Sequence, residues 1–219
     1  MNRYLLTIGF AFAFAIPTAS LARHRYSSAN DAQLLAVCPI RGDAKNLSVR
    51  ALNKLKRRMS VPSPAYVDKS VTLGAMVALG DDTNRFDSGK AAIVDGYVAD
   101  VKVGGVESVN CHTHDPKYRD THIEITLDPL HDDESKHVII EVTPQWRELM
   151  ATRGIDWSTS ALRKLLLGHW IRVTGWLLFD KEHASASENT AAVGNQVWRA
   201  TAWEIHPITS LQVLPGKPG

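Results

Sequence analysis

Residues 137–179 read HVIIEVTPQWRELMATRGIDWSTSALRKLLLGHWIRVTGWLLF. The hydrophobic pattern changes twice within this stretch. Residues 137–143 and 169–179 are short runs rich in Val, Ile and Trp, which is typical of strands. Between them, residues 158–167 offer Ser and Thr as N-terminal caps and place three leucines on one face, and Gly168 then provides a stop signal. We therefore predict a strand, a helix and a strand.

Similar apolar runs flank this stretch on both sides. Two precede it, at residues 92–103 and 121–127, and one follows it at residues 198–214, with a break near Pro207. Three strands, one helix and two strands is the element order of an OB-fold, a five-stranded Greek-key barrel. Closing the sheet also removes most of the edges that promote aggregation. We predict a mainly β, OB-fold-like domain over residues 90–214, with a small sandwich as the alternative.

The second and third predicted strands each have a core face and an outer face, because alternate residues of a strand point to opposite sides of the sheet. The core face consists of Thr121, Ile123, Ile125, Val138, Ile140 and Val142. The outer face of these strands is the usual ligand-binding surface of an OB-fold. Besides Ile139, it carries Asp120, His122, Glu124, His137 and Glu141, which we predict to bind a ligand. The alternative is that these residues are only the solvated side of an amphipathic barrel.

Two long loops flank this predicted ligand surface, at residues 104–120 and 180–197. Both carry histidines and acidic residues, which are common ligands of divalent metal ions. The candidate metal ligands are His112, His114, His183 and Glu182. The His-x-His spacing is a much weaker signal than a pair of Cys-x-x-Cys motifs, so a divalent metal ion is only a candidate cofactor.

The chain has two cysteines, Cys38 and Cys111. In an oxidising compartment they have one possible intramolecular pairing, and a disulfide closing a loop of this length stabilises a protein by roughly 4 kcal/mol. We favour the disulfide. The alternative is that Cys111 is a thiolate metal ligand beside His112 and His114.

The N-terminal residues 1–22 have the three parts of a secretory signal peptide. Arg3 supplies a positive charge, residues 4–16 are an apolar run, and Ser20 and Ala22 are small residues at the cleavage positions. The apolar run is too short to cross a bilayer, which needs about 20 apolar residues, and no later segment reaches that length. We therefore expect an exported protein, periplasmic or secreted, with no transmembrane segment in the mature chain.

A basic segment follows over residues 23–89, with 11 Lys and Arg against 6 Asp and Glu, whereas residues 90–214 have 12 against 17. Asp43 is a plausible N-cap for an amphipathic helix that ends near Met59. Such a helix can bind anionic lipid or nucleic acid. We favour the other interpretation, in which its basic face packs on the acidic domain of the same chain.

Shorter helices are predicted at residues 31–37 and 71–79, and Pro62 and Pro64 mark a linker between the longer helix and the second of these. Residues 215–219 form a tail.

The strand predicted at 169–179 places Trp170, Arg172 and Trp176 on the outside of the barrel. Exposed tryptophans can stack on bases or sugar rings. We favour a packing role beneath the N-terminal helices, because an exported protein with adjacent exposed tryptophans is prone to aggregate. In the last strand, Trp203 and Ile205 are predicted to be core residues, with Glu204 and His206 outside.

Four phrases of the sequence resemble a group of uncharacterised bacterial exported proteins with an OB-fold-like domain. They are residues 96–98 (GYV), 101–107 (VKVGGVE), 120–124 (DTHIE) and 198–207 (WRATAWEIHP). The resemblance covers about residues 38–214 and implies an exported OB-fold-like protein, but no activity.

A second resemblance is to the thermonuclease type of OB-fold enzyme, which carries an Asp-Thr-Pro-Glu run. This chain has Val142-Thr143-Pro144-Gln145 instead, so the calcium-binding Asp and the catalytic Glu are both replaced. The resemblance therefore argues against nuclease activity.

Charge also argues against nucleic acid as a partner, because nucleic-acid affinity comes mainly from cations that neutralise phosphates. The predicted ligand surface carries Asp120, Glu124 and Glu141, which repel a polyanion. We therefore predict a non-catalytic binding module for a cation, a small molecule or an envelope protein partner. The alternatives are a metal-dependent hydrolase that uses the loop histidines, and a structural envelope protein.

Overall fold

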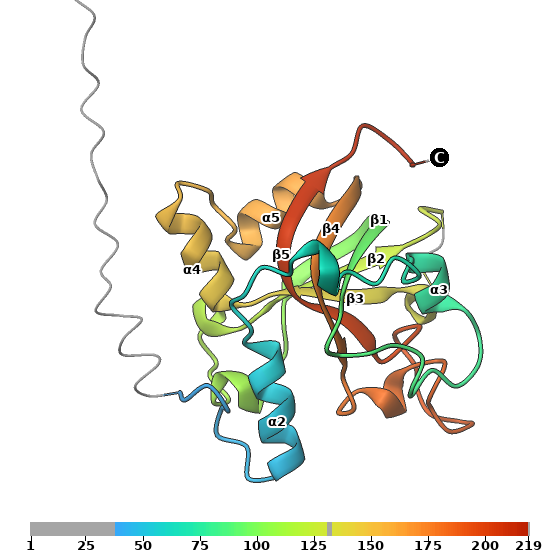
Figure 1. Ribbon diagram of the computed structural model, residues 1–219, viewed down its shortest axis with the longest axis horizontal. Coiled ribbons are helices and arrows are strands. Elements are labelled where there is room, and N and C mark those ends of the chain that lie inside the picture. The colour runs from blue at the N-terminus through green and yellow to red at the C-terminus, as the bar shows by residue number, and fades with distance from the viewer. Residues whose placement is uncertain (1–37, 131–132, 219) are drawn as a thin grey trace, which may run out of the picture.

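The structure, a computed structural model, describes residues 38–130 and 133–218. The predicted signal peptide and the helix predicted at 31–37 therefore lie outside the described residues. Figure 1 shows a strand barrel with helices packed around it. No helix in the described part of the chain is long and apolar enough to cross a membrane.

Five strands form a closed barrel in the order β1-β2-β3-β5-β4. Their bounds are β1 Ala91–Val103, β2 Thr121–Thr126, β3 Val138–Val142, β4 Trp170–Phe179 and β5 Trp203–Val213. Neighbouring strands are antiparallel except for β3 and β5, which are parallel and place Ile140 opposite Ile205. The predicted OB-fold-like barrel is confirmed, and so is the alternation that directs the apolar residues of β2 and β3 into the core.

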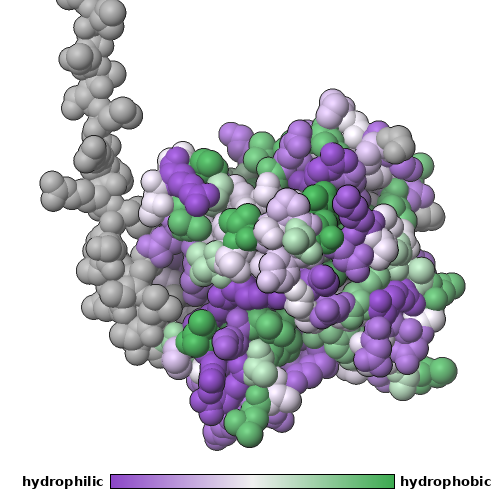
Figure 2. Space-filling model, in the orientation of Figure 1, coloured by the Kyte–Doolittle hydropathy of each residue, from purple (hydrophilic) through white to green (hydrophobic). Residues whose placement is uncertain are grey.

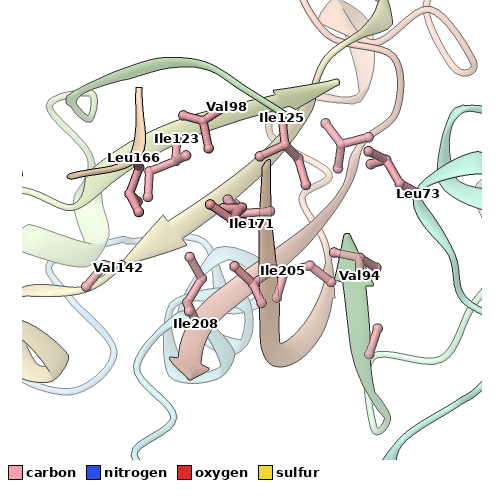
Figure 3. Close-up of a cluster of buried hydrophobic side chains, with 14 of the residues drawn as sticks. Leu73, Val94, Val98, Ile123, Ile125, Val142, Leu166, Ile171, Ile205 and Ile208 are labelled. Carbon is pink, nitrogen blue, oxygen red and sulfur yellow. The ribbon is translucent and has the colours of Figure 1, made fainter. Parts of the chain in front are cut away.

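One helix between β3 and β4, α5 (Thr159–Leu166), begins and ends close to the predicted positions. The backbone N–H of Ala161 donates to Ser158 Oγ at 3.3 Å, so Ser158 is the cap. Leu162 and Leu166 are fully buried and belong to the same hydrophobic cluster as the barrel interior (Figure 3). This helix therefore completes the core of the barrel.

A further helix, α4 (Pro144–Thr152), precedes α5 and was not predicted. The sequence contains the start signals of this helix. Thr143 is the N-cap, whose Oγ1 accepts a hydrogen bond from the backbone N–H of Trp146, and Pro144 is the first helical residue. Trp146 is fully buried and its Nε1 donates to the carbonyl of Arg58 at 2.9 Å. α4 thus connects the barrel to the N-terminal segment.

The predicted basic helix is shorter than expected. It is α2 (Leu47–Lys56), and its cap is Asn46 rather than Asp43. Asp43 is used elsewhere, since its backbone N–H donates to Ser108 and its carboxylate lies 3.0 Å from His112 Nδ1. The short helix α3 (Leu73–Val77) lies inside the range predicted for it.

The last strand begins at Trp203, five residues later than predicted, and continues through Pro207 without a break. Its pairing with β4 is irregular opposite Gly175, where a Cβ atom would lie only 2.5 Å from the carbonyl oxygen of Pro207. The preceding residues do not extend the strand, because their backbone bonds go elsewhere: the N–H of Ala200 donates to the carbonyl of His137, just before β3, and the N–H of Trp198 donates to the carbonyl of Ala186.

The N-terminal segment packs on the barrel, as its charge predicted. Trp176 on β4 is 7% exposed, its Nε1 donates to the carbonyl of Ser60 at 2.7 Å, and the guanidinium carbon of Arg58 lies 4.8 Å from the centre of its ring. The packing role predicted for this tryptophan is confirmed. Trp170 is only half-buried and lies beside Tyr97.

The predicted disulfide between Cys38 and Cys111 is present. It joins the start of the described chain to the loop between β1 and β2. On the outside of the molecule, Figure 2 shows hydrophilic and hydrophobic residues mixed over the visible face. Short 3-10 turns punctuate the loops, at Pro64–Tyr66, Ser108–Asn110, Pro116–Tyr118, Glu134–Lys136 and Ala184–Ala186.

Candidate functional site

The outer face of β2 and β3 is buried, whereas both interpretations of the sequence expected it to be exposed. All five residues predicted there are buried, and the most exposed of them, His122, is 8% exposed. They are Asp120, His122, Glu124, His137 and Glu141. The prediction that these residues form an open ligand surface is therefore wrong, although the strand alternation that grouped them is right.

Two segments from elsewhere in the chain cover this face. Lys56, at the end of α2, reaches Glu107 and Asp180 at 2.7 and 2.8 Å. The ring of Trp198, in the loop between β4 and β5, lies against the His122 ring, with 6.1 Å between the ring centres. Burying ionised groups requires that they be paired, and on this face Glu141 pairs with His122, while Glu124 pairs with His137 and with Lys102 of β1.

The buried face contains paired carboxylates and imidazoles. His122 Nδ1 lies 2.9 Å from Glu141 Oε1, and His137 Nδ1 lies 2.8 Å from Glu124 Oε2. Lys102 on β1 also donates to Glu124. These contacts hold the acidic side chains of β2 and β3 in fixed positions.

β5 adds Glu204 and His206 to this buried face. The sequence predicted that both lie outside the barrel but did not include them in any site. His206 is fully buried, and its Nδ1 lies 3.1 Å from Glu204 Oε2 and 3.2 Å from Glu141 Oε2. Its Nε2 lies 3.9 Å from Asp120 Oδ2. The only signal in the sequence was their alternation with Trp203 and Ile205, which gives a side of the sheet and not a partner.

Asp120, Glu141 and His206 form the first of two groups with the composition of a metal site. One donor atom from each residue lies within 4.8 Å of the others, and all three side chains are buried. The Asn110 side chain donates to Asp120 Oδ2 at 3.2 Å. His206 Nε2 and Glu141 Oε2 make no hydrogen bond with any described residue.

Burial and neighbouring charges together set the pKa values in and around this first group. Burial and repulsion from Glu141 raise the pKa of Asp120 to about 7. Burial acts to lower the pKa of His206, but the neighbouring carboxylates, first Glu141, outweigh it and raise that pKa. Burial likewise acts to lower the pKa of His122, yet its hydrogen bonds to Glu124 and Glu141 raise the pKa to about 9. Protons on the imidazoles therefore balance part of the buried negative charge.

The second group is Asp180, His183 and Glu204. Its carboxylates already have permanent cationic partners, because Lys56 lies 2.8 Å from Asp180 and Arg199 lies 2.8 Å from Glu204. Burial acts to raise the pKa of Asp180, but attraction to Lys56 outweighs it and holds that pKa well below its ordinary value. This second group is explained by ion pairs within the chain.

The predicted metal site in the loops does not form as a unit. His112, His114 and Glu182 belong to neither of the two groups found among the described residues. His112 is exposed and pairs with Asp43, and Cys111 is committed to the disulfide, so it is not a thiolate ligand. Of the four predicted ligands only His183 falls in a group, with different partners from those expected.

A pocket of about 340 Å³ opens beside the buried face. Its wall includes His122, Glu141 and Glu204, together with Trp198 and Lys102. Glu141 therefore belongs both to the first group and to the wall of a cavity. A larger groove of about 920 Å³ lies between the end of β1, α4 and α5, and none of the predicted site residues lines it.

Comparison of the chain with models of known protein families and with curated proteins gives no match.

Proposed function

We propose that this protein is an exported, non-catalytic OB-fold module that binds a cation between Asp120 and Glu141. One observation supports this most strongly. Among the described residues, these are neighbouring buried carboxylates whose ion pairs involve only imidazoles, whereas Glu124, Asp180 and Glu204 each pair with a lysine or arginine. An imidazole offsets a buried carboxylate only while it is protonated, and buried charges that are not fully paired are costly, so a bound cation stabilises this arrangement.

The same burial argues against two other partners. The residues predicted to meet an envelope protein are covered by the chain itself, with Asp120, Glu124 and Glu141 each at most 4% exposed. A nucleic acid would meet both this cover and the negative charge beneath it. A small cation is the ligand class that fits a buried pair of carboxylates of which one, Glu141, lines a pocket of about 340 Å³.

Thermal unfolding of the mature protein tests this proposal. The protein is stripped with a chelator, dialysed, and heated at constant ionic strength with MgCl2, CaCl2, MnCl2 or ZnCl2. We expect at least one cation to raise the Tm, because a ligand present at 100 times its Kd stabilises the folded state by about 2.7 kcal/mol.

Isosteric variants provide the controls. Asparagine matches aspartate in size and glutamine matches glutamate. The matched changes are therefore Asp120→Asn and Glu141→Gln, each of which should abolish the Tm increase. Glu134→Gln, an exposed residue in the wall of the same pocket, should leave it intact. A folded wild-type protein whose Tm responds to none of the four cations contradicts the proposal.

Metal-dependent hydrolysis is the second candidate function, because Glu141 lines the pocket and would connect a bound metal ion to a substrate there. Asp120 and His206 do not line the pocket, which favours binding over catalysis. Assays of the cation-loaded protein with chromogenic carboxyl and phosphate esters distinguish the two. Turnover that disappears in Asp120→Asn would favour the enzyme.

The proposal that the chain is exported is supported by the disulfide, since disulfides persist mainly in oxidising compartments. N-terminal sequencing of the protein recovered from its native host tests it. We expect the mature chain to begin at Arg23, after cleavage behind Ala22. Recovery of the chain with residues 1–22 still attached would contradict export by this signal.

A further inference from the structure

His206 on β5 has one ring nitrogen that the fold of the chain does not use. The side chain is fully buried, and Nδ1 is placed to donate to Glu204 Oε2 at 3.1 Å. Nε2 makes no hydrogen bond with any described residue and lies 3.9 Å from Asp120 Oδ2. A buried polar atom without a partner costs about 1 to 3 kcal/mol, so this arrangement calls for a ligand.

The spacing of the three side chains suits a single small ion. Metal to nitrogen and metal to oxygen bonds of about 2.0 to 2.2 Å place the ligand atoms around one ion about 3 to 4 Å apart. The 3.9 Å separation of His206 Nε2 and Asp120 Oδ2 lies in this range. Glu141 Oε2 makes no hydrogen bond with any described residue, although it lies 3.2 Å from His206 Nδ1. It belongs to the same group, in which one donor atom from each residue lies within 4.8 Å of the others.

We propose that Asp120, Glu141 and His206 coordinate a divalent transition-metal ion of the zinc type, with His206 bound through Nε2. This inference rests on the proposed function and names the class of its cation. An imidazole ligand selects against Ca²⁺ and Mg²⁺, which prefer all-oxygen coordination, and suits Zn²⁺, Co²⁺ and their first-row neighbours.

Each ligand is also held by a neighbour in the way that metal sites require. A histidine ligand usually donates its other ring N–H to a carboxylate, which fixes the tautomer and the ring orientation. Glu204 serves this purpose for His206, and His122 Nδ1 holds the other oxygen of Glu141 at 2.9 Å. Asn110 holds Asp120. The donor atoms are therefore oriented before the ion binds.

The neighbouring second group provides an internal comparison. Asp180, His183 and Glu204 have the same residue types and a similar spacing, but Lys56 and Arg199 supply its positive charge. The first group has no lysine or arginine ion pair among the described residues. One metal ion per chain is therefore expected, and it belongs to the first group.

Titration of the stripped protein with CoCl2 and ZnCl2 tests the inference. Co²⁺ should produce visible absorption that saturates at one ion per chain, and Zn²⁺ should displace it. His206→Asn keeps an amide that can donate to Glu204 but removes the Nε2 ligand. It should weaken Zn²⁺ binding by more than about 100-fold, since residues that only orient a metal ligand are worth about 10- to 100-fold. His183→Asn, in the second group, should bind Zn²⁺ as the wild-type protein does.

If His206→Asn fails to fold, X-ray absorption of the zinc-loaded wild-type protein tests the same ligands. We expect one imidazole and oxygen donors at about 2.0 Å, without sulfur. A spectrum without imidazole, or unchanged Zn²⁺ affinity in folded His206→Asn, would overturn the inference. If Ca²⁺ or Mg²⁺ binds through Asp120 and Glu141 while Zn²⁺ and Co²⁺ do not, the cation-binding function stands and the metal class is wrong. If no cation binds, both are wrong.

Discussion

The ammonium of Lys56 lies 2.8 Å from Asp180 Oδ2, and neither side chain is more than 1% exposed. This ion pair joins the last residue of α2 to the residue that follows β4. Burial acts to lower the pKa of Lys56, but attraction first to Asp180 and then to Glu107 outweighs it and raises that pKa well above its ordinary value. The lysine is therefore the cation that attaches the N-terminal segment to the acidic side of the barrel.

Replacing this lysine should destabilise the protein strongly. Lys56→Met leaves Asp180 without its ammonium partner, and breaking a buried pair on one side costs about 3 to 5 kcal/mol. Lys54→Met, on the same helix but exposed, should change the free energy of unfolding by less than about 0.5 kcal/mol. Urea unfolding at pH 7 measures both. Equal midpoints for the two variants would show that the pair contributes little.

Stability at acidic pH should depend on Glu124. Burial acts to raise its pKa, but hydrogen bonds from His122, His137 and Lys102 outweigh it and hold the pKa well below the ordinary value. Asp100, 3.5 Å from Lys102, is the other charge on this side. A carboxylate with a depressed pKa stabilises the folded state above its unfolded pKa of about 4.3, and this contribution is lost as the pH falls further.

Glu124→Gln removes that contribution. The difference in unfolding free energy between wild type and Glu124→Gln should therefore shrink between about pH 5 and pH 3, by more than about 1.4 kcal/mol, the equivalent of one pKa unit. Urea unfolding at a series of pH values measures it. A difference that stays constant over this range would mean that the pKa of Glu124 is not depressed.

Trp176 should contribute more to stability than Trp170 on the same strand. Trp176→Phe loses the hydrogen bond to Ser60 and the contact with the Arg58 guanidinium, together worth about 1 to 2 kcal/mol. Trp170→Phe is the matched control, since Trp170 is only half-buried, and it should cost less than about 0.5 kcal/mol. The comparison uses chemical unfolding followed by circular dichroism. A larger loss in Trp170→Phe would contradict the packing role of Trp176.

The disulfide should stabilise the chain substantially. Cys38 and Cys111 are 73 residues apart, and closing a loop of this length is worth roughly 4 kcal/mol in the chain-entropy model. The double variant Cys38→Ala with Cys111→Ala should therefore unfold at a clearly lower urea concentration, and reduction of the wild-type protein should lower the midpoint similarly. An unchanged midpoint after either treatment would exclude a stabilising bridge.

Local patterns were enough to predict the barrel. The alternation in residues 121–127 and 137–143 depends only on which side of the sheet is apolar, and Ser158 and Gly168 mark the ends of a helix by backbone chemistry within a few residues. α4 was missed although Thr143 and Pro144 are ordinary start signals, because the apolar run of β3 ends directly before them.

The candidate site could not be predicted in the same way. Alternation put His206 and Glu141 on the outer side of their strands, and polar residues there are normally solvated. Whether such a face is exposed depends on segments distant in sequence, and here the end of α2 and the loop before β5 cover it. The loop histidines were grouped by proximity in sequence, whereas the groups that form combine residues from different strands and loops.

The sequence by itself determined the order of strands and helix along the barrel domain and the side of each strand that faces the core, and it left one possible cysteine pairing, because periodicity, capping and the number of cysteines are local or countable properties. Only the tertiary structure decided that the acidic outer face is buried and that Asp120, Glu141 and His206 meet without an ion pair to any lysine or arginine in the described part of the chain. The reason is that burial and charge pairing are set by the distances between side chains that the closed barrel and its covering loops bring together, and those distances are not encoded in any single segment.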